Sequence, residues 1–267
     1  MKKFLVILAT VTSLVFAACS RKPTVDEVVN KMMQTLGGVE KIASMQDQVS
    51  TWESKVMMPQ GDTTTTMTAT MTITYKRPNK LKYEAKDSNG NIGYISVFDG
   101  SHGWIYMMGP DGVDTVRDMT PTEIQEATIA AETWADAWYH YAAKGFKLTM
   151  LPDTVMAGKT YHRIHATDRF GNVSLNYFDT QTCLVERTDT EVSDPVTMQK
   201  TPSVMTLSDY AVRDGYMVIG KYTQSDTRGA ILTQATLQEV KHNTNITDEA
   251  FARPVTTVQR TKHTAKR

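Results

Sequence analysis

The most regular pattern in the chain is a run in which apolar residues alternate with threonines. Its apolar members are Met67, Ala69, Met71, Ile73 and Tyr75. Because successive side chains of a β-strand point to opposite faces, this run predicts a half-buried strand. Period-two segments recur from residue 49 to residue 242 and are separated by Gly, Pro, Asn and Asp. About eleven or twelve such strands favour a mainly β fold, with a large curved sheet or barrel rather than a sandwich.

The other predicted strands are joined by turn residues. They cover residues 81–85, 92–98, 103–108, 160–168, 173–178 and 182–190, with three further segments between 204 and 242. Asn89-Gly90 separates the first two, and this dipeptide is typical of a type I′ hairpin turn. Short connections of this kind predict antiparallel pairing of consecutive strands.

An amphipathic helix is predicted ahead of the strands. Thr24 and Glu27 have the spacing of a capping box, in which each side chain satisfies a free backbone N–H of the first turn. The apolar residues that follow fall on one helical face: Val25, Val28, Val29, Met32 and Leu36. Gly37-Gly38 ends this helix, and residues 39–44 predict a second short helical turn.

A second amphipathic helix is predicted between the strands. Thr120 and Glu123 form another capping box, and Pro121 stands at the first helical position, where a missing N–H costs nothing. Apolar residues then recur three and four apart as far as Gly145: Ile124, Ala127, Ala131, Trp134, Trp138 and Tyr141. Such a wide stripe must lie on an apolar surface. Residues 246–251 predict a short final helix.

The first 18 residues read as an export signal. Lys2 and Lys3 precede a mostly apolar run, Phe4–Phe16, that is too short to span a bilayer. Phe16-Ala17-Ala18-Cys19 resembles a lipobox, the cleavage site at which the cysteine of a bacterial lipoprotein is acylated. The alternative is an ordinary signal peptide with a cysteine nearby. Two or three acyl chains on Cys19 would make membrane attachment effectively permanent.

The rest of the chain divides into three parts. Residues 19–23 form a lipidated tether, residues 24–254 a single β domain, and residues 255–267 a polar, basic tail that we expect to be disordered. Ser20 in place of Asp after the cysteine favours sorting to the outer membrane. Without the signal peptide the chain has two more acidic than basic side chains, and nothing indicates nucleic-acid binding. Cys183 is then the one free thiol, so no intramolecular disulfide can form.

Several short motifs resemble those of the LolA- and LolB-type lipoprotein-sorting superfamily. They are Gly37-Gly38 with Ile42, Lys76-Arg77-Pro78, Phe98-Asp99-Gly100, Gly103-Trp104, Tyr177-Phe178-Asp179, and Asp248 with Phe251 in the ending 245–254. Their order covers about residues 24 to 254. The resemblance implies an incomplete antiparallel barrel whose concave face is covered by helices, with a hydrophobic cavity between them that holds acyl chains in the carriers.

A set of apolar residues is the candidate lining of such a cavity. On the strands these are Met67, Met71, Ile73, Tyr83, Ile95, Val97, Trp104 and Tyr106, and on the covering helix Ile124, Trp134 and Trp138. Methionine is adaptable and suits heterogeneous chains. The alternative for any one of these residues is ordinary packing in a closed core.

The sequence offers little for catalysis, metals or cofactors. His162 and His165 lie in a predicted strand and would point to opposite faces, and no zinc-binding motif occurs. No nucleophile elbow is present. The oxygen-rich segment from Asp87 to Asn91 lacks the acidic twelfth residue of a calcium loop, because Phe98 stands there, and a hairpin turn explains it better. We therefore expect a protein that is not an enzyme and holds neither a metal nor a cofactor.

Two functions remain open at this stage. The first is a periplasm-facing lipoprotein of the outer membrane, attached by its N-terminal acyl anchor, that binds the acyl chains of lipids or lipoproteins as a carrier or receptor. The second is a lipid-anchored scaffold or stress sensor that binds another envelope protein through its surface. The two differ in whether the cavity is filled by a ligand or closed by core packing.

Overall fold

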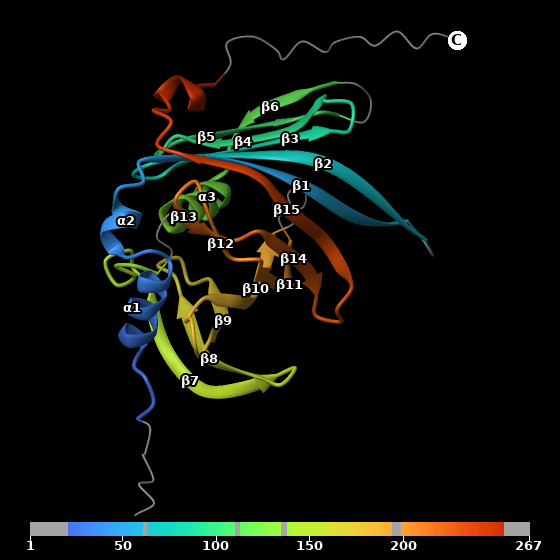
Figure 1. Cartoon of the computed structure of the whole chain (residues 1–267). Coiled ribbons are helices and arrows are strands. Elements are labelled where there is room, and N and C mark those ends of the chain that lie inside the picture. The colour runs from blue at the N-terminus through green and yellow to red at the C-terminus, as the bar shows by residue number, and fades with distance from the viewer. Residues whose placement is uncertain (1–20, 61–62, 110–112, 135–137, 194–198, 254–267) are drawn as a thin grey trace, which may run out of the picture.

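A computed structural model describes residues 21–60, 63–109, 113–134, 138–193 and 199–253. The predicted signal peptide, Cys19 and the tail from residue 254 onward lie outside these described residues. Within them, the fold is one large antiparallel sheet of thirteen strands with three α-helices and a small hairpin. The sheet curls around α3 and the hairpin without closing on itself (Figure 1). The predicted mainly β, incomplete barrel is confirmed.

Most strands lie beside the strand that precedes or follows them in the chain, and β1 pairs with β15 where the first and last parts of the chain meet. Their order is β6-β5-β4-β3-β2-β1-β15-β14-β11-β10-β9-β8-β7, so β6 and β7 are the two free edges. Their bounds are β1 Asp47–Gln60, β2 Thr63–Lys76, β3 Lys80–Asp87, β4 Ile92–Phe98, β5 Gly103–Met107, β6 Thr115–Asp118, β7 Lys147–Met156, β8 Lys159–Thr167, β9 Val173–Asp179, β10 Val185–Ser193, β11 Lys200–Ser208, β14 Lys221–Asp226 and β15 Ile231–His242. The strands β12 (Ala211–Arg213) and β13 (Tyr216–Val218) form the separate hairpin.

The helices begin where the capping residues predict. In α1 (Val25–Thr35), the Glu27 N–H donates to Thr24 Oγ1 at 3.2 Å, and the Thr24 N–H donates to Glu27 Oε2 at 2.6 Å. The same reciprocal pair, Thr120 and Glu123, opens α3 (Pro121–Trp134). The helix α2 (Val39–Ala43) and the final 3-10 turn η1 (Asp248–Phe251) are also present as predicted. Among the described residues, no helix is both long and apolar enough to cross a membrane.

The end of α3 differs from the prediction. The described part of the helix ends at Trp134, and residues 138–145 form turns, with His140 at φ +54°. The strand β7, which follows directly, was not predicted. Trp138 and Tyr141 continue the three- and four-residue spacing of apolar side chains into these turns. These two side chains are apolar because they pack against the cluster beneath α1. The apolar spacing therefore could not locate the helix end.

The turn at Asn89-Gly90 also differs from the prediction. Gly90 has φ +81°, but Asn89 does not share the positive φ that a type I′ turn requires of both central residues. The Asp87 side chain instead accepts the backbone N–H groups of Asn89 and Asn91, both at 2.8 Å. An aspartate-supported turn with glycine in the left-handed region therefore replaces the type I′ turn, and the segment serves as a hairpin turn as expected.

The buried core of the described residues consists of three hydrophobic clusters. The first joins α1 and α2 to β8–β10, around Met33 and Phe178. The second lies between α3 and the concave face of the sheet, around Trp52 and Tyr75. The third lies on the opposite face, around Val97 and Phe251. All three clusters are built from described residues.

Candidate ligand-binding cavity

A cavity of about 330 Å³ lies between the concave face of the sheet and the elements that cover it. The cover consists of α1, α2, the C-terminal end of α3 and the β12–β13 hairpin, which sits inside the curve of the sheet (Figure 1). The aromatic part of its wall is Trp52, Trp134, Trp138, Tyr210 and Tyr216. Its thioether side chains are Met32, Met45 and Met217. Aliphatic residues, among them Leu207 and Leu237, fill most of the remaining wall, which is therefore predominantly apolar.

Two further cavities adjoin the first along α3. One of about 570 Å³ lies between α3 and β8–β11 and shares Trp138, Asn176 and Thr188 with the first cavity. Another of about 270 Å³ lies between α3 and β3–β5 and shares Glu126 and Ala130 with the second. Small-molecule pockets typically measure roughly 300–1,000 Å³. The space around α3 is therefore large enough for a ligand, and neighbouring cavities share wall residues.

Trp134 fixes the end of α3 against the sheet. Its indole Nε1 donates to Gln48 Oε1 on β1 at 2.9 Å. Its ring meets the edge of Tyr83 on β3, with 6.3 Å between ring centroids and an interplanar angle of 86°. Burial raises the pKa of Tyr83 well above its ordinary value, and it also raises the pKa of Tyr222 nearby. The surface beneath α3 is thus an environment that disfavours charge.

Five of the predicted lining residues lie together on the concave face or on the helix above it. Met71, Ile73, Tyr83, Ile124 and Trp134 belong to the cluster beneath α3. Trp134 and Trp138 line the 330 Å³ cavity, and Tyr83 lines the 270 Å³ cavity. Trp138 reaches the cavity from the turns after α3 rather than from the helix itself.

Four predicted lining residues lie on the other face of the sheet. Ile95, Val97, Trp104 and Tyr106 pack against Phe251 of η1, and Trp104 Nε1 donates to the Phe251 carbonyl oxygen at 3.3 Å. The register explains this placement. Tyr83 on the concave face pairs with Ser96, so Ile95 and Val97 on either side of Ser96 point to the other face. The strands β4 and β5 are apolar on both faces, so alternation alone could not assign the concave one. These four residues form a closed core.

Met67 lies away from every cavity described above. It is 44% exposed and lies on the outer part of the β1–β2 hairpin, beyond Ala69, where pairing of β2 with β3 begins. The alternation of this run continues past the edge of the buried core, so the pattern overstates the buried length of β2.

The main cavity also contains residues that sequence analysis did not single out. Trp52 stands between Ser50 and Ser54 in a period-two run, and this spacing could have indicated that its side chain is buried. It pairs with Met71 across β1 and β2. Leu207 and Leu237 lie in β11 and β15, and only the pairing register of these strands shows that the two side chains face the cavity. His242, at the end of β15, carries no pattern in the sequence that predicts its burial.

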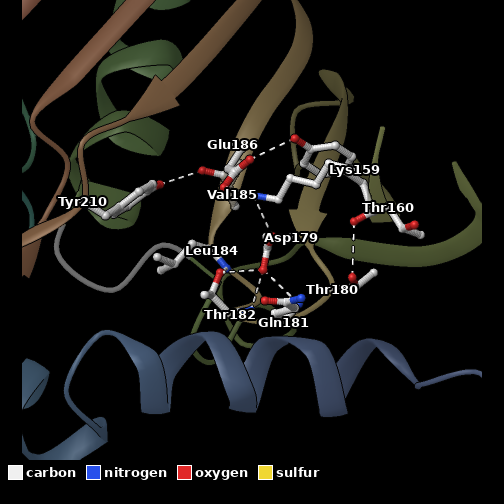
Figure 2. Close-up of polar contacts among 11 residues, drawn as sticks. Lys159, Thr160, Asp179, Thr180, Gln181, Thr182, Leu184, Val185, Glu186 and Tyr210 are labelled. Carbon is white, nitrogen blue, oxygen red and sulfur yellow. Dashed lines mark hydrogen bonds and ion pairs between the residues drawn. The ribbon is translucent and has the colours of Figure 1, made fainter. Parts of the chain in front are cut away.

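Asp179, the last residue of the Tyr177-Phe178-Asp179 motif, is at the centre of a polar network at the β9–β10 turn (Figure 2). Asp179 Oδ1 accepts the N–H groups of Gln181 and Thr182 at 2.8 and 2.6 Å, and Oδ2 pairs with Lys159 Nζ at 2.6 Å. Thr35 at the end of α1 donates to the Thr182 carbonyl oxygen at 2.6 Å. The network therefore shapes the β9–β10 turn on which the C-terminal end of α1 rests.

Stability should depend on the ionisation of Asp179. Burial raises the pKa of this carboxyl, but Lys159 and the turn N–H groups outweigh it and hold the pKa at about 2, below the ordinary 3.8. The group therefore stabilises the fold above pH 3.8, and this stabilisation is lost as the pH falls through about 2. The shift corresponds to about 2 kcal/mol.

The measurement is urea unfolding of the wild-type chain and of Asp179→Asn between about pH 5 and about pH 2. We expect the difference in unfolding free energy between them to shrink as the pH falls. A difference that stays constant over this range would contradict the role of the ionised carboxylate. Glu40→Gln, at an exposed residue of α2, is the control for a general effect of removing a carboxylate.

The described residues show no group of three or more His, Cys, Asp or Glu side chains placed to hold a metal ion. His162 Nδ1 lies 3.0 Å from Asp153 Oδ1. His162 pairs with Phe178 and His165 with Leu175, so the two histidines point to opposite faces of β8. Cys183 is buried in the cluster beneath α1, and burial raises the pKa of its thiol.

The curved open sheet with helices over its concave face defines the LolA-like fold. A LolA superfamily protein from Nitrosomonas europaea is similar at 11% sequence identity and a TM-score of 0.57, over 87% of this chain and 99% of the other. A DUF1329 family protein from Desulfovibrio piger has 12% identity and a TM-score of 0.55, over 86% and 98%. A Vibrio parahaemolyticus domain described as an outer membrane lipoprotein-sorting protein has 9% identity and a TM-score of 0.53, over 84% and 94%. No family model and no curated protein matches the chain.

Proposed function

We propose that the chain is a lipoprotein of the bacterial outer membrane, anchored through Cys19 and facing the periplasm, whose residues 24–254 bind an acyl chain. The bound chain belongs to a lipid or to another lipoprotein, so the protein acts as a carrier or receptor. The observation that carries this proposal is the apolar cavity beneath the covering helices, with three tryptophans in its wall and two adjoining cavities alongside α3.

The chemistry of the wall suits an acyl chain. Each methylene group removed from water contributes roughly 0.8 kcal/mol. Binding therefore needs a continuous apolar surface and no particular geometry along the chain. The thioethers of Met32, Met45 and Met217 adapt to chains of different length and branching. The LolA-like fold of the solved neighbours is consistent with such a cavity.

The test is a substitution that fills the cavity. In the chain from Ser20 onward, purified without detergent, we expect Leu207→Trp to weaken binding of a dodecyl chain by at least about tenfold, because the larger side chain occupies the cavity. Native mass spectrometry and lipid extraction measure the bound chain. Val212→Trp is the matched control, since Val212 is 65% exposed on the neighbouring hairpin.

The outcomes separate the proposal from the scaffold alternative. A stoichiometric lipid in the wild-type chain and in Val212→Trp, but not in Leu207→Trp, supports acyl-chain binding. An empty wild-type chain that takes up no added fatty acid or lipopeptide contradicts it. Recovery of a discrete envelope protein that binds wild type and Leu207→Trp equally would then favour the scaffold or sensor.

A further inference from the structure

His242 is a buried polar side chain in the wall of the 330 Å³ cavity. Its side chain is only 1% exposed. Its Nε2 is buried and has no hydrogen-bond partner, and it is the one side-chain nitrogen or oxygen in the described residues of which this is true. A buried polar atom without a partner is destabilising, so such atoms are rare in native structures and call for an explanation.

The other side of the imidazole is held firmly. Nδ1 lies 3.1 Å from Asp214 Oδ2, in the turn of the β12–β13 hairpin, and the same oxygen accepts the His242 backbone N–H at 2.6 Å. The ring of Tyr216 stacks on the imidazole, with 4.1 Å between centroids, and Lys41 Nζ lies 4.2 Å from the Tyr216 ring centre. The ring therefore cannot turn without losing these contacts.

This arrangement fixes which nitrogen carries the proton. An ionised carboxylate only accepts hydrogen bonds, so Nδ1 is the donor to Asp214. Burial lowers the pKa of His242 more than Asp214 raises it, and the hydrogen bonds from His242 lower the pKa of Asp214. Near neutral pH the imidazole is therefore uncharged, and Nε2 presents a lone pair.

The surroundings leave that lone pair for a ligand. Gln48, the cross-strand neighbour of His242, accepts the Trp134 indole N–H on its Oε1, and its amide N–H groups do not donate to His242 Nε2. Trp134, Leu237 and Met217 in the same wall present indole, alkyl and thioether groups, and no described side chain donates to Nε2. A ligand in this cavity thus meets an acceptor at one point of an apolar wall.

We propose that His242 Nε2 accepts a hydrogen bond from the bound acyl compound, and that the cavity prefers acyl chains whose head carries an uncharged donor, either a hydroxyl or an amide N–H. This inference rests on the proposed acyl-chain binding and adds a head-group preference to it. An ester or ether without a donor leaves Nε2 unpaired. A carboxylate brings a second acceptor against the lone pair and is disfavoured as well.

The test uses two pairs of probes that differ in one donor. N-methyl lauramide is compared with N,N-dimethyl lauramide, and 1-dodecanol with dodecyl methyl ether, in the chain from Ser20 onward by titration calorimetry. We expect the donor-bearing member to bind about tenfold more tightly than its partner in at least one pair. The pair that shows the preference distinguishes an amide head from a hydroxyl head. His242→Phe should reduce the preference within that pair to about onefold. Val212→Trp, at an exposed residue outside the cavity wall, is the control and should keep both the preference and the binding of the donor-free probes.

Each result decides between the possibilities. Equal binding within both pairs in the wild-type chain overturns the role of His242 and leaves acyl-chain binding intact. Binding of none of the four probes overturns both proposals. If His242→Phe does not fold, ¹⁵N NMR of the wild-type histidines replaces it. A change in the unprotonated Nε2 resonance with the donor-bearing probe alone supports the hydrogen bond, and the same change with both probes overturns it.

Discussion

Replacing Phe251 with alanine is expected to lower the free energy of unfolding by about 4 kcal/mol. Phe251 is 2% exposed and packs against Ile95, Val97, Trp104 and Tyr106 on the face of the sheet opposite α3. The substitution leaves a cavity in this cluster, because the surrounding strands are held by the sheet and cannot collapse onto it. Urea unfolding followed by circular dichroism gives the loss in stability.

The matched control is Phe170→Ala, in the exposed turn between β8 and β9. Phe170 is 40% exposed and lies beneath the guanidinium of Arg169 at 5.1 Å, so the expected loss is under about 1 kcal/mol. Binding of a dodecyl chain by folded Phe251→Ala should match the wild type, since the two sites lie on opposite faces. Impaired binding with unchanged stability would show that this cluster contacts the ligand.

Replacing Trp134 with alanine is expected to cost about 3 kcal/mol of unfolding free energy. The side chain connects α3 to the sheet through its hydrogen bond to Gln48 and its edge contact with Tyr83. Both are lost, and the 330 Å³ cavity gains the space of an indole. Trp134→Phe keeps an aromatic ring but loses the N–H donor, so its effect should fall between wild type and alanine.

Gln125→Ala is the control for changes in α3 itself, because Gln125 is exposed on the same helix, and it should change stability by less than about 0.5 kcal/mol. Thermal or urea unfolding of the three variants ranks the contributions. A loss for Trp134→Ala no larger than that for Gln125→Ala would mean that α3 is not held on the sheet by this residue.

The sequence predicted helices and strands well where the interactions that define them join residues close together in the chain. Thr24 with Glu27 and Thr120 with Glu123 place the starts of α1 and α3, since each capping box involves groups within one turn. The long alternating run predicts β2. The strand β7 was missed because Pro152 interrupts its pattern and the apolar spacing of the preceding turns resembles that of a helix.

Where both faces of the sheet are buried, the sequence could not predict which face a given side chain occupies. In β4, Ile95 and Val97 turn toward Phe251 while Phe98 turns toward α3, and both sets are equally apolar. Cross-strand register decides the matter, and register depends on partners distant in the chain. The same holds for His242, whose burial results from strand β15 passing beneath the β12–β13 hairpin.

An open sheet leaves a row of unpaired backbone groups at each edge, which invites aggregation between copies of the chain. Here β6 is only four residues long, and β7 carries Pro152 within an irregularity between Leu151 and Thr154. Arg163 Nε donates a hydrogen bond to the Pro152 carbonyl oxygen at 2.7 Å. A short strand and an interrupted one make poor templates for a further strand. The barrel can therefore stay open around its cavity while edge-to-edge self-association of the protein is suppressed.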